Sequence, residues 1–237
     1  MEIERRINKD YIHHQKSTLS NVLKEVVFGA EDGMVSTLGS ITGIAIGSNN
    51  HSTVILAGVV IVAVESISMG IGSYLSNRSQ EEVEERKIKE EKEELEKFPR
   101  EEKEELLAIY LEEGWSEKLA LEMSEEVSKN HNLMLKEMKI HELKIADGED
   151  TVSVKGAISM FFAYILGGII PLFAYFILPI NNAIPFSITI TLIGLFVLGM
   201  STTKFTKQPL IKSGFKVLIM GGIALSAGLV AGVLLGQ

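Results

Sequence analysis

Acidic side chains lie inside apolar stretches of this sequence, and their spacing puts them on common helical faces. One helical stripe of the first stretch, with intervals of four, three and four residues, consists of Glu25, Gly29, Asp32 and Ser36. In the second stretch, Glu65 and Met69 are one helical turn apart. Carboxylates combined with a thioether sulfur suit a divalent cation of intermediate softness, which favours Fe²⁺ or Mn²⁺ over Ca²⁺.

The cost of placing acids in lipid indicates a function for these side chains. A central Asp costs about 2.5–3.5 kcal/mol to insert, whereas each Leu, Ile, Phe or Val returns about 0.3–0.6 kcal/mol. Together Glu31 and Asp32 cost at most about 5–7 kcal/mol, whereas the eight such residues of 26–47 return only about 2.4–4.8 kcal/mol. These acids must therefore face protein, water or a cation. Pairing with a buried basic residue is the alternative, but Lys204 and Lys216 lie only near the ends of apolar segments. Such carboxylates can also carry protons, which makes proton-coupled exchange possible.

A second set of carboxylates occupies a charged segment, residues 76–155, which holds 24 of the 31 acids. The pairs Glu91-x-x-Glu94 and Glu102-x-x-Glu105 each stack on one helical face, and a turn at Pro99 can fold the two faces together. Four converging carboxylates would bind divalent cations, as in di-metal helical bundles. The alternative is a solvated face held by Glu–Lys pairs four residues apart.

Long apolar runs predict an all-α integral membrane protein with five transmembrane helices, because a bilayer-crossing helix needs about 20 mostly apolar residues. The runs lie at 24–47, 53–75, 156–178, 186–205 and 214–235. Three further helices are expected in the charged insertion between the second and third runs, at 78–97, 100–113 and 116–145. Pro99 suits a helix start and Gly114 a helix end.

The distribution of Lys and Arg predicts the orientation. All 23 lie in 1–24, 78–155 or 204–216, so these regions should face the cytoplasm. The expected organisation is a cytoplasmic segment over 1–23, transmembrane helices over 24–75, a cytoplasmic acidic metal-binding domain over 76–155 and transmembrane helices over 156–237. The C-terminus should lie on the opposite side. We expect no cleavable signal peptide, because residues 1–21 lack an apolar core.

Composition excludes several classes of function. The net charge of −8 argues against a nucleic-acid partner and suits cations. Without cysteine, the chain has neither a disulfide nor a thiolate metal site. The sequence shows no nucleophile–base pair, H-E-x-x-H motif or phosphate-binding glycine loop, so we do not expect an enzyme. Glycines at four-residue spacing allow helices to pack closely in lipid, within one subunit or between two.

Several of these segments resemble the vacuolar iron transporter family. The matching segments are VVFGAEDGMVSTLGSITGIA, ESISMGIGSYLSNRSQ, EEKEELEKFPREEKEEL, HELKI and YILGGIIPLFAYF. The most specific parts are the DG of the first span, the SMG of the second and the Glu/Pro/Glu pattern of the acidic segment. The fourth and fifth spans match only in general character.

The resemblance implies a homodimer of five-helix subunits with a pore on the two-fold axis, in which H⁺-driven antiport moves Fe²⁺ out of the cytoplasm. Asp32 and Met69 match pore metal ligands of the family, and Glu25 stands where the family often has an acid. The residues that match the family's metal-collecting set are Glu91, Glu94, Glu102, Glu105, Met138 and Glu142.

Three positions depart from the family pattern. Ile61 stands where some members have a pore Glu, and Glu65 one turn further on can substitute for it. Lys139 replaces the second residue of a Met pair, which weakens the loop site or removes one of its metals, and Ser73 stands where many prokaryotic members have Glu. Among the histidines, His141 beside Glu142 is the candidate auxiliary ligand.

Two hypotheses follow. The first is a proton-coupled transporter for Fe²⁺, with Mn²⁺, Zn²⁺ or Co²⁺ as other transported and loop-bound ions and no prosthetic group. The alternative is a membrane-anchored divalent-metal buffer or sensor without transport. The compact length and the lack of a targeting segment favour a prokaryotic plasma membrane over a vacuole.

Overall fold

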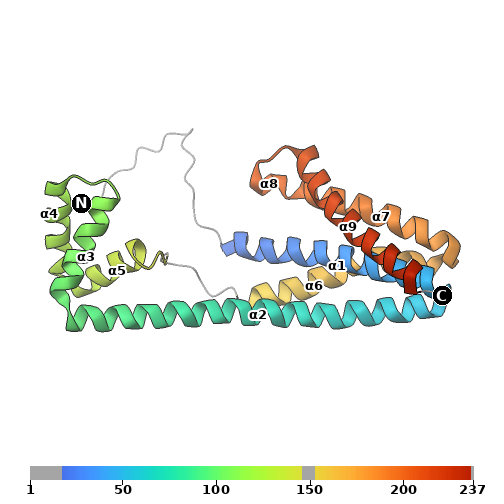
Figure 1. The fold of residues 1–237 in the computed structure, drawn as a ribbon, viewed down its shortest axis with the longest axis horizontal. Coiled ribbons are helices and arrows are strands. Elements are labelled where there is room, and N and C mark those ends of the chain that lie inside the picture. Colours follow the sequence, from blue (N-terminus) through green and yellow to red (C-terminus); the bar gives the residue numbers. More distant parts are fainter. Residues whose placement is uncertain (1–17, 146–152, 236–237) are drawn as a thin grey trace.

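The computed structural model describes residues 18–145 and 153–235, and all regular elements in these ranges are helices (Figure 1). They are α1 (Thr18–Ser48), α2 (His51–Lys97), α3 (Pro99–Glu112), α4 (Glu117–Ser128), α5 (His131–His141), α6 (Ser153–Ile177), α7 (Ile180–Ser201), α8 (Thr203–Thr206) and α9 (Leu210–Leu235). The predicted all-α class is confirmed for the described residues.

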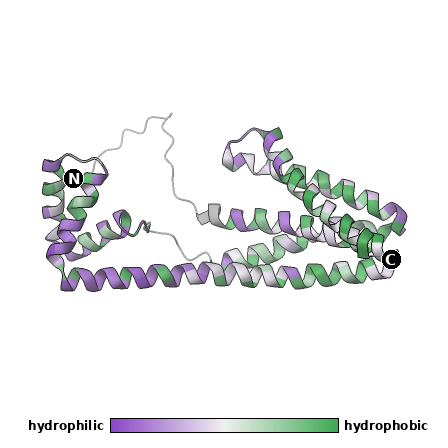
Figure 2. Ribbon diagram, viewed as in Figure 1, coloured by the Kyte–Doolittle hydropathy of each residue, from purple (hydrophilic) through white to green (hydrophobic). Residues whose placement is uncertain are grey.

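A bundle of α1, α6, α7, α9 and the first half of α2 forms one end of the molecule, and Figure 2 shows that it is mostly apolar. Four described helices are long and apolar enough to cross a membrane: α2, α6, α7 with α8, and α9. This makes the chain a multi-pass membrane protein. The predicted fifth span, α1, does not meet that criterion, because its long stretch contains Glu31, Asp32 and many Gly, Ser and Thr residues.

Neighbouring helices enclose α1, and glycine permits the close approach. A Cβ on Gly33 would lie 2.3 Å from the carbonyl oxygen of Tyr164 in α6. On another side of α1, a Cβ on Gly43 would lie 2.5 Å from the carbonyl oxygen of Gly228 in α9. These glycines therefore pack helices of one subunit, which was the first of the two alternatives drawn from their spacing.

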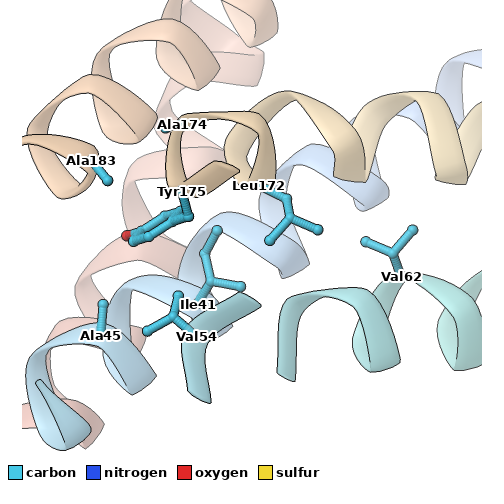
Figure 3. Close-up of a cluster of buried hydrophobic side chains, with 8 residues drawn as sticks. All are labelled: Ile41, Ala45, Val54, Val62, Leu172, Ala174, Tyr175 and Ala183. Carbon is cyan, nitrogen blue, oxygen red and sulfur yellow. The ribbon is translucent and has the colours of Figure 1, made fainter. Parts of the chain in front are cut away.

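The apolar core of the bundle lies where α1, α2, α6 and α7 meet (Figure 3). Its largest members, Ile41, Leu172 and Tyr175, are almost fully buried. Ser187 of α7 donates a hydrogen bond of 2.7 Å to the carbonyl oxygen of Pro171 in α6, which ties α7 to the helix that carries the proline. This core holds α1 and α2 side by side and so fixes the relative position of their acids.

Helix α2 differs from the prediction, because the expected span 53–75 and the expected helix 78–97 are one continuous helix of 47 residues. No Pro or Gly interrupts residues 73–97. Pairs spaced four residues apart support its exposed half, including Arg78–Glu82 at 3.1 Å and Arg86–Glu90 at 3.2 Å. Figure 1 shows α2 running from the apolar bundle to the charged helices α3, α4 and α5.

The helices of the acidic segment pack on a small core of their own, which includes Leu106, Tyr110 and Met138. The helix expected over 116–145 is two helices, α4 and α5. The break lies at Asn130, whose side chain accepts hydrogen bonds from the backbone N–H groups of Asn132 and Leu133 and so caps α5. Helix α7 also begins earlier than expected, at Ile180, directly after Pro179.

Candidate metal centre

Three carboxylates from separate elements converge in the acidic segment. Glu91 belongs to α2, Glu102 to α3, and Glu142 is the residue that follows α5. One oxygen of each lies within 4.8 Å of the others. Glu91 is only 2% exposed and Glu102 only 6% exposed. A divalent cation at the centre of this triangle would have three hard oxygen ligands.

Local structure explains the convergence. Pro99 begins α3 directly after α2 ends, and the turn at Phe98 brings the first turn of α3 back toward the last turns of α2. Leu95 and Leu106, one turn beyond Glu91 and Glu102 respectively, are buried in the common core. The two carboxylates therefore lie on the same helical faces as the apolar residues and are carried inward with them.

The three carboxylates are mutually repulsive acids with buried oxygen atoms. Oxygen atoms of Glu91, Glu102 and Glu142 are buried without a hydrogen-bond partner. Burial, followed by the proximity of Glu142 and Glu102, raises the pKa of Glu91 to about 9. Burial and the charge of Glu105 raise the pKa of Glu102 to about 7. A bound cation would satisfy the oxygens and displace these protons.

The other predicted ligands surround this triangle. Met138 is fully buried, one helical turn before Glu142. Glu94 and Glu105 are exposed, so the structure does not draw all four loop carboxylates into the buried set. Burial, followed by the charges of Glu142 and Glu94, raises the pKa of Glu105. Glu105 therefore lies close enough to Glu142 of the triangle to interact with it. The structure thus brings together one acid of each predicted E-x-x-E pair, with Glu142 as the third.

Both ring nitrogens of His141, the predicted auxiliary ligand, contact carboxylates of other residues than Glu142. Its Nδ1 lies 2.7 Å from Oε1 of Glu113, and its Nε2 lies 3.3 Å from Oε2 of Glu137. Both ring nitrogens thus face other carboxylates. Tyr110 donates a hydrogen bond of 2.9 Å to the same oxygen of Glu137, and its ring meets the His141 ring edge to face. This network joins α3 to α5 and so positions Glu142. Sequence spacing did not reveal the network, because its hydrogen bonds link residues that are 27 and 28 positions apart.

The acids of α1 and α2 form a second candidate site within the apolar segments of these helices, with Asp32 half-buried and Glu65 exposed in the single chain. Asp32 lies close enough to Glu65 for their charges to repel, and Tyr164 of α6 lies near both. The Tyr164 hydroxyl is 2.5 Å from that of Ser36, one turn after Asp32 on the predicted stripe. Among the described residues, no Lys or Arg forms an ion pair with Asp32 or Glu65. Tyr164 is the member that sequence reasoning missed, although it lies in a segment that carried the family resemblance.

The remaining predicted residues lie along the same two helices. Glu25 is half-buried on α1, seven residues and about 10 Å along the axis from Asp32. Met69 is half-buried one turn beyond Glu65, which is itself exposed in the single chain. Ile61 lies one turn before Glu65, and Ser73 is buried one turn beyond Met69. The structure therefore places Glu65 within electrostatic reach of Asp32.

The two candidate sites are far apart, although one helix connects them. Glu65 and Glu91 are 26 residues apart on the continuous α2, which is about 39 Å along the helix axis. That distance is several times the screening length of about 8 Å at physiological ionic strength. A metal in one site would therefore not interact directly with the charges of the other.

Comparison with known proteins agrees with this architecture. A family model described as the VIT family matches residues 23–233. The chain is 32% identical over 218 residues to a vacuolar iron transporter 1 of Tulipa gesneriana, covering 91% of this chain and 88% of that protein. It is 29% identical over 228 residues to one of Arabidopsis thaliana, covering 96% and 91%. A vacuolar iron transporter of Plasmodium berghei is 30% identical over 240 residues, covering 97% and 87%. These relatives carry the names of transporters and not of enzymes.

Proposed function

Since this chain belongs to the VIT family, we propose that it transports divalent metal ions, with Fe²⁺ as the main substrate, across a membrane in exchange for protons. Mn²⁺, Co²⁺ and Zn²⁺ are the secondary substrates of this proposal. Transport runs out of the cytoplasm, and the acidic helices α3–α5 with the end of α2 collect the ion before it enters the bundle.

One observation supports the proposal: half-buried Asp32 interacts electrostatically with Glu65 on the neighbouring apolar helix, and neither has a basic partner among the described residues. Two such carboxylates repel each other and lose hydration, so they are stabilised when a divalent cation or protons bind between them. Met69, one turn from Glu65, supplies the softer thioether that suits Fe²⁺. Alternate occupation by a metal ion and by protons is the physical basis of exchange at this position.

Two further features of the proposal concern the assembly. Helix α1 is the fifth span, and its acids tolerate the membrane because α2, α6, α7 and α9 contact it. The exposed side of α2 carries Val64, Ile67 and Ile71 beside the exposed Glu65. A second copy packed on this side would remove Glu65 from lipid and enclose the path, which supports a homodimer.

Orientation follows the positive-inside rule, with the acidic helices and the N-terminal segment cytoplasmic and the C-terminus opposite. The comparisons give no support to the predicted prokaryotic plasma membrane, since the relatives named above are plant and Plasmodium proteins.

The test is metal flux into proteoliposomes that contain a metal-quenched dye, with an imposed pH gradient. We expect Asp32→Asn to abolish Fe²⁺-dependent quenching, because the neutral amide cannot exchange a metal ion for a proton. The control is Glu101→Gln, an exposed acid outside both sites, which should transport normally. Unchanged flux through Asp32→Asn would remove this pair of acids from the path.

A metal buffer or sensor remains the second candidate, because the buried triangle of Glu91, Glu102 and Glu142 accounts for metal binding without any transport. The same preparation separates the two functions. A buffer binds Fe²⁺ stoichiometrically and shows no flux, even with a pH gradient. A transporter shows flux that disappears in Asp32→Asn while metal binding to the triangle persists.

A further inference from the structure

A polar pocket of about 580 Å³ lies between α1, the α8 connector and α9. Apart from Thr202, the polar residues that line it are Glu31, Thr206, Gln208, Lys212, Ser213 and Lys216. None of the predicted metal ligands lines this pocket. Glu31, which immediately precedes Asp32, thus belongs to a different environment from its neighbour.

The pocket and its surroundings are basic. Residues 202–216 contain four lysines and no acid, and Glu31 is the only acid that lines the pocket. Glu31 lies close enough to Lys216 to interact with its positive charge. Among the described residues, however, neither Lys212 nor Lys216 forms an ion pair within 4.0 Å. Two lysines opposite one carboxylate leave a net positive charge, which repels a divalent cation and attracts an anion.

The chemistry of the lining fits a phosphate group. Lysine binds phosphate as a point charge, and hydroxyl and amide groups donate hydrogen bonds to phosphate oxygens. Thr206, Gln208 and Ser213 provide these donors beside Lys212 and Lys216. A carboxylate ligand would gain the same charge attraction, but a phosphate has more oxygens to accept the several donors.

The position of the pocket indicates where the phosphate comes from. Figure 2 shows the polar connector between the apolar helices α7 and α9. Around the pocket, exposed apolar side chains reach the surface, namely Phe205, Leu210, Ile211 and Phe215. Apolar residues beside lysines at the end of membrane helices are typical of the headgroup region, where basic pockets bind anionic lipid headgroups.

We propose that this pocket binds the phosphate group of an anionic membrane lipid, with Lys212 and Lys216 as the charged ligands and the acyl chains lying against the exposed apolar residues. The headgroup would join α1 to the α7–α9 hairpin from the outside. The proposal does not depend on metal transport, because it rests on a different pocket and is measured by lipid binding.

The test uses the full-length purified protein, stripped of lipid in detergent and titrated with phosphatidylglycerol while bound lipid is counted by native mass spectrometry. We expect about one tightly held phosphatidylglycerol per chain and weaker binding of phosphatidylcholine. The double variant Lys212→Gln/Lys216→Gln should lower the affinity about tenfold or more, since each lysine near a membrane surface contributes to anionic-lipid binding. Lys212→Arg/Lys216→Arg keeps the charge and should retain binding.

The matched control is Lys204→Gln/Lys207→Gln, which removes the same charge from the connector that precedes α9, from residues that do not line the pocket. Equal loss in both double variants would mean diffuse surface charge and would overturn the site. Equal binding of both lipids would overturn its anion selectivity. Inorganic phosphate that competes at millimolar concentration, with no lipid retained, would show a soluble phosphate ligand and overturn the lipid assignment. If the variant Lys212→Gln/Lys216→Gln unfolds, the deciding measurement is the binding of phosphatidylglycerol against phosphatidylcholine by the unmodified protein.

Discussion

At the scale of single residues, the buried carboxylates of the acidic helices have the donor atoms that a divalent cation would need. Glu91, Glu102 and Glu142 have buried oxygens without partners, although buried polar atoms are normally hydrogen-bonded. Removing one of the three charges lowers the affinity for a divalent ion, because affinity follows the number of charged ligands. Exposed acids of the same helices do not share this environment.

We therefore expect Glu102→Gln to weaken Mn²⁺ binding by the full-length protein about tenfold or more, which corresponds to about 1.4 kcal/mol. Isothermal titration calorimetry in detergent measures this change. Glu104→Gln is the matched control on the same helix, since Glu104 is exposed and paired with Arg100 at 3.1 Å. An equal loss in both variants would show that general acidity and not the buried triangle binds the ion.

The pKa values of the same residues predict a pH dependence. With a pKa of about 9 for Glu91 and about 7 for Glu102, both bind protons in the folded, metal-free state at pH values where an unfolded Glu would be ionised. The folded state then holds more protons than the unfolded state between about pH 4.5 and pH 9, so the stability of the metal-free acidic helices falls as pH rises through this window.

Metal binding must displace these protons, so affinity for Mn²⁺ should rise from pH 6 to pH 8 and binding should release protons. Calorimetric titrations in two buffers of different ionisation enthalpy count the released protons. Glu91→Gln should reduce the number released. Binding without proton release at pH 7 would contradict the raised pKa values.

At the scale of elements, glycine decides which helices can touch. A Cβ on Gly228 of α9 would lie 2.0 Å from the backbone carbonyl oxygen of Gly39, whereas a Cβ on Gly222 of the same helix meets nothing within 4 Å. We expect Gly228→Ala to destabilise the bundle by about 1–3 kcal/mol through overpacking, and Gly222→Ala to leave stability unchanged or slightly higher. Thermal unfolding in detergent compares the two variants. Similar melting temperatures would mean that α1 and α9 pack less closely than described.

The length of helix α2 determines how far the acidic helices lie from the bundle. Because it continues for 47 residues, it sets the spacing between the bundle and the acidic helices. The chain contains no cysteine, so in the double variant Ser68→Cys/Lys92→Cys spin labels attach only to the two introduced cysteines. These exposed positions are 24 residues apart, so we expect a narrow distance distribution near 36 Å.

This measurement uses labelled protein diluted with unlabelled protein, so that only distances within one chain contribute. The pair Ser79→Cys and Glu96→Cys, 17 residues apart in the exposed half, should give about 26 Å as an internal reference. A broad distribution for the longer pair alone would show a break between the two halves of α2.

At the scale of the whole molecule, one helix carries a member of each acidic site, and the two sites are too far apart for direct electrostatic coupling. Transport and metal collection should therefore be separable by mutation. Asp32→Asn removes an acid from the bundle and leaves the acidic helices unchanged. Glu102→Gln removes an acid from the buried triangle and leaves the bundle unchanged. In a metal transporter, the second variant should lose flux mainly at low metal concentration.

Much of this architecture was predictable from the sequence. Apolar runs and the charged insertion predicted an all-α membrane protein, since lipid tolerates few charges and a helix satisfies its own backbone. The stripe through Asp32 and Ser36 followed from helical periodicity, and one acid of each E-x-x-E pair reached the buried triangle. The span assigned to α1 and the homodimer remain predictions, as do the predicted orientation and domain boundaries.

Only the tertiary structure decided which acids share a site, because periodicity describes one helix and says nothing about its neighbours. It separated Glu31, beside Lys216, from Asp32, beside Glu65. It also turned His141 toward Glu113 and Glu137 and added Tyr164 to the acids of the bundle. Contacts of this kind depend on how helices far apart in the chain pack together, and so the sequence determined the chemistry that was available while packing selected the groups that meet.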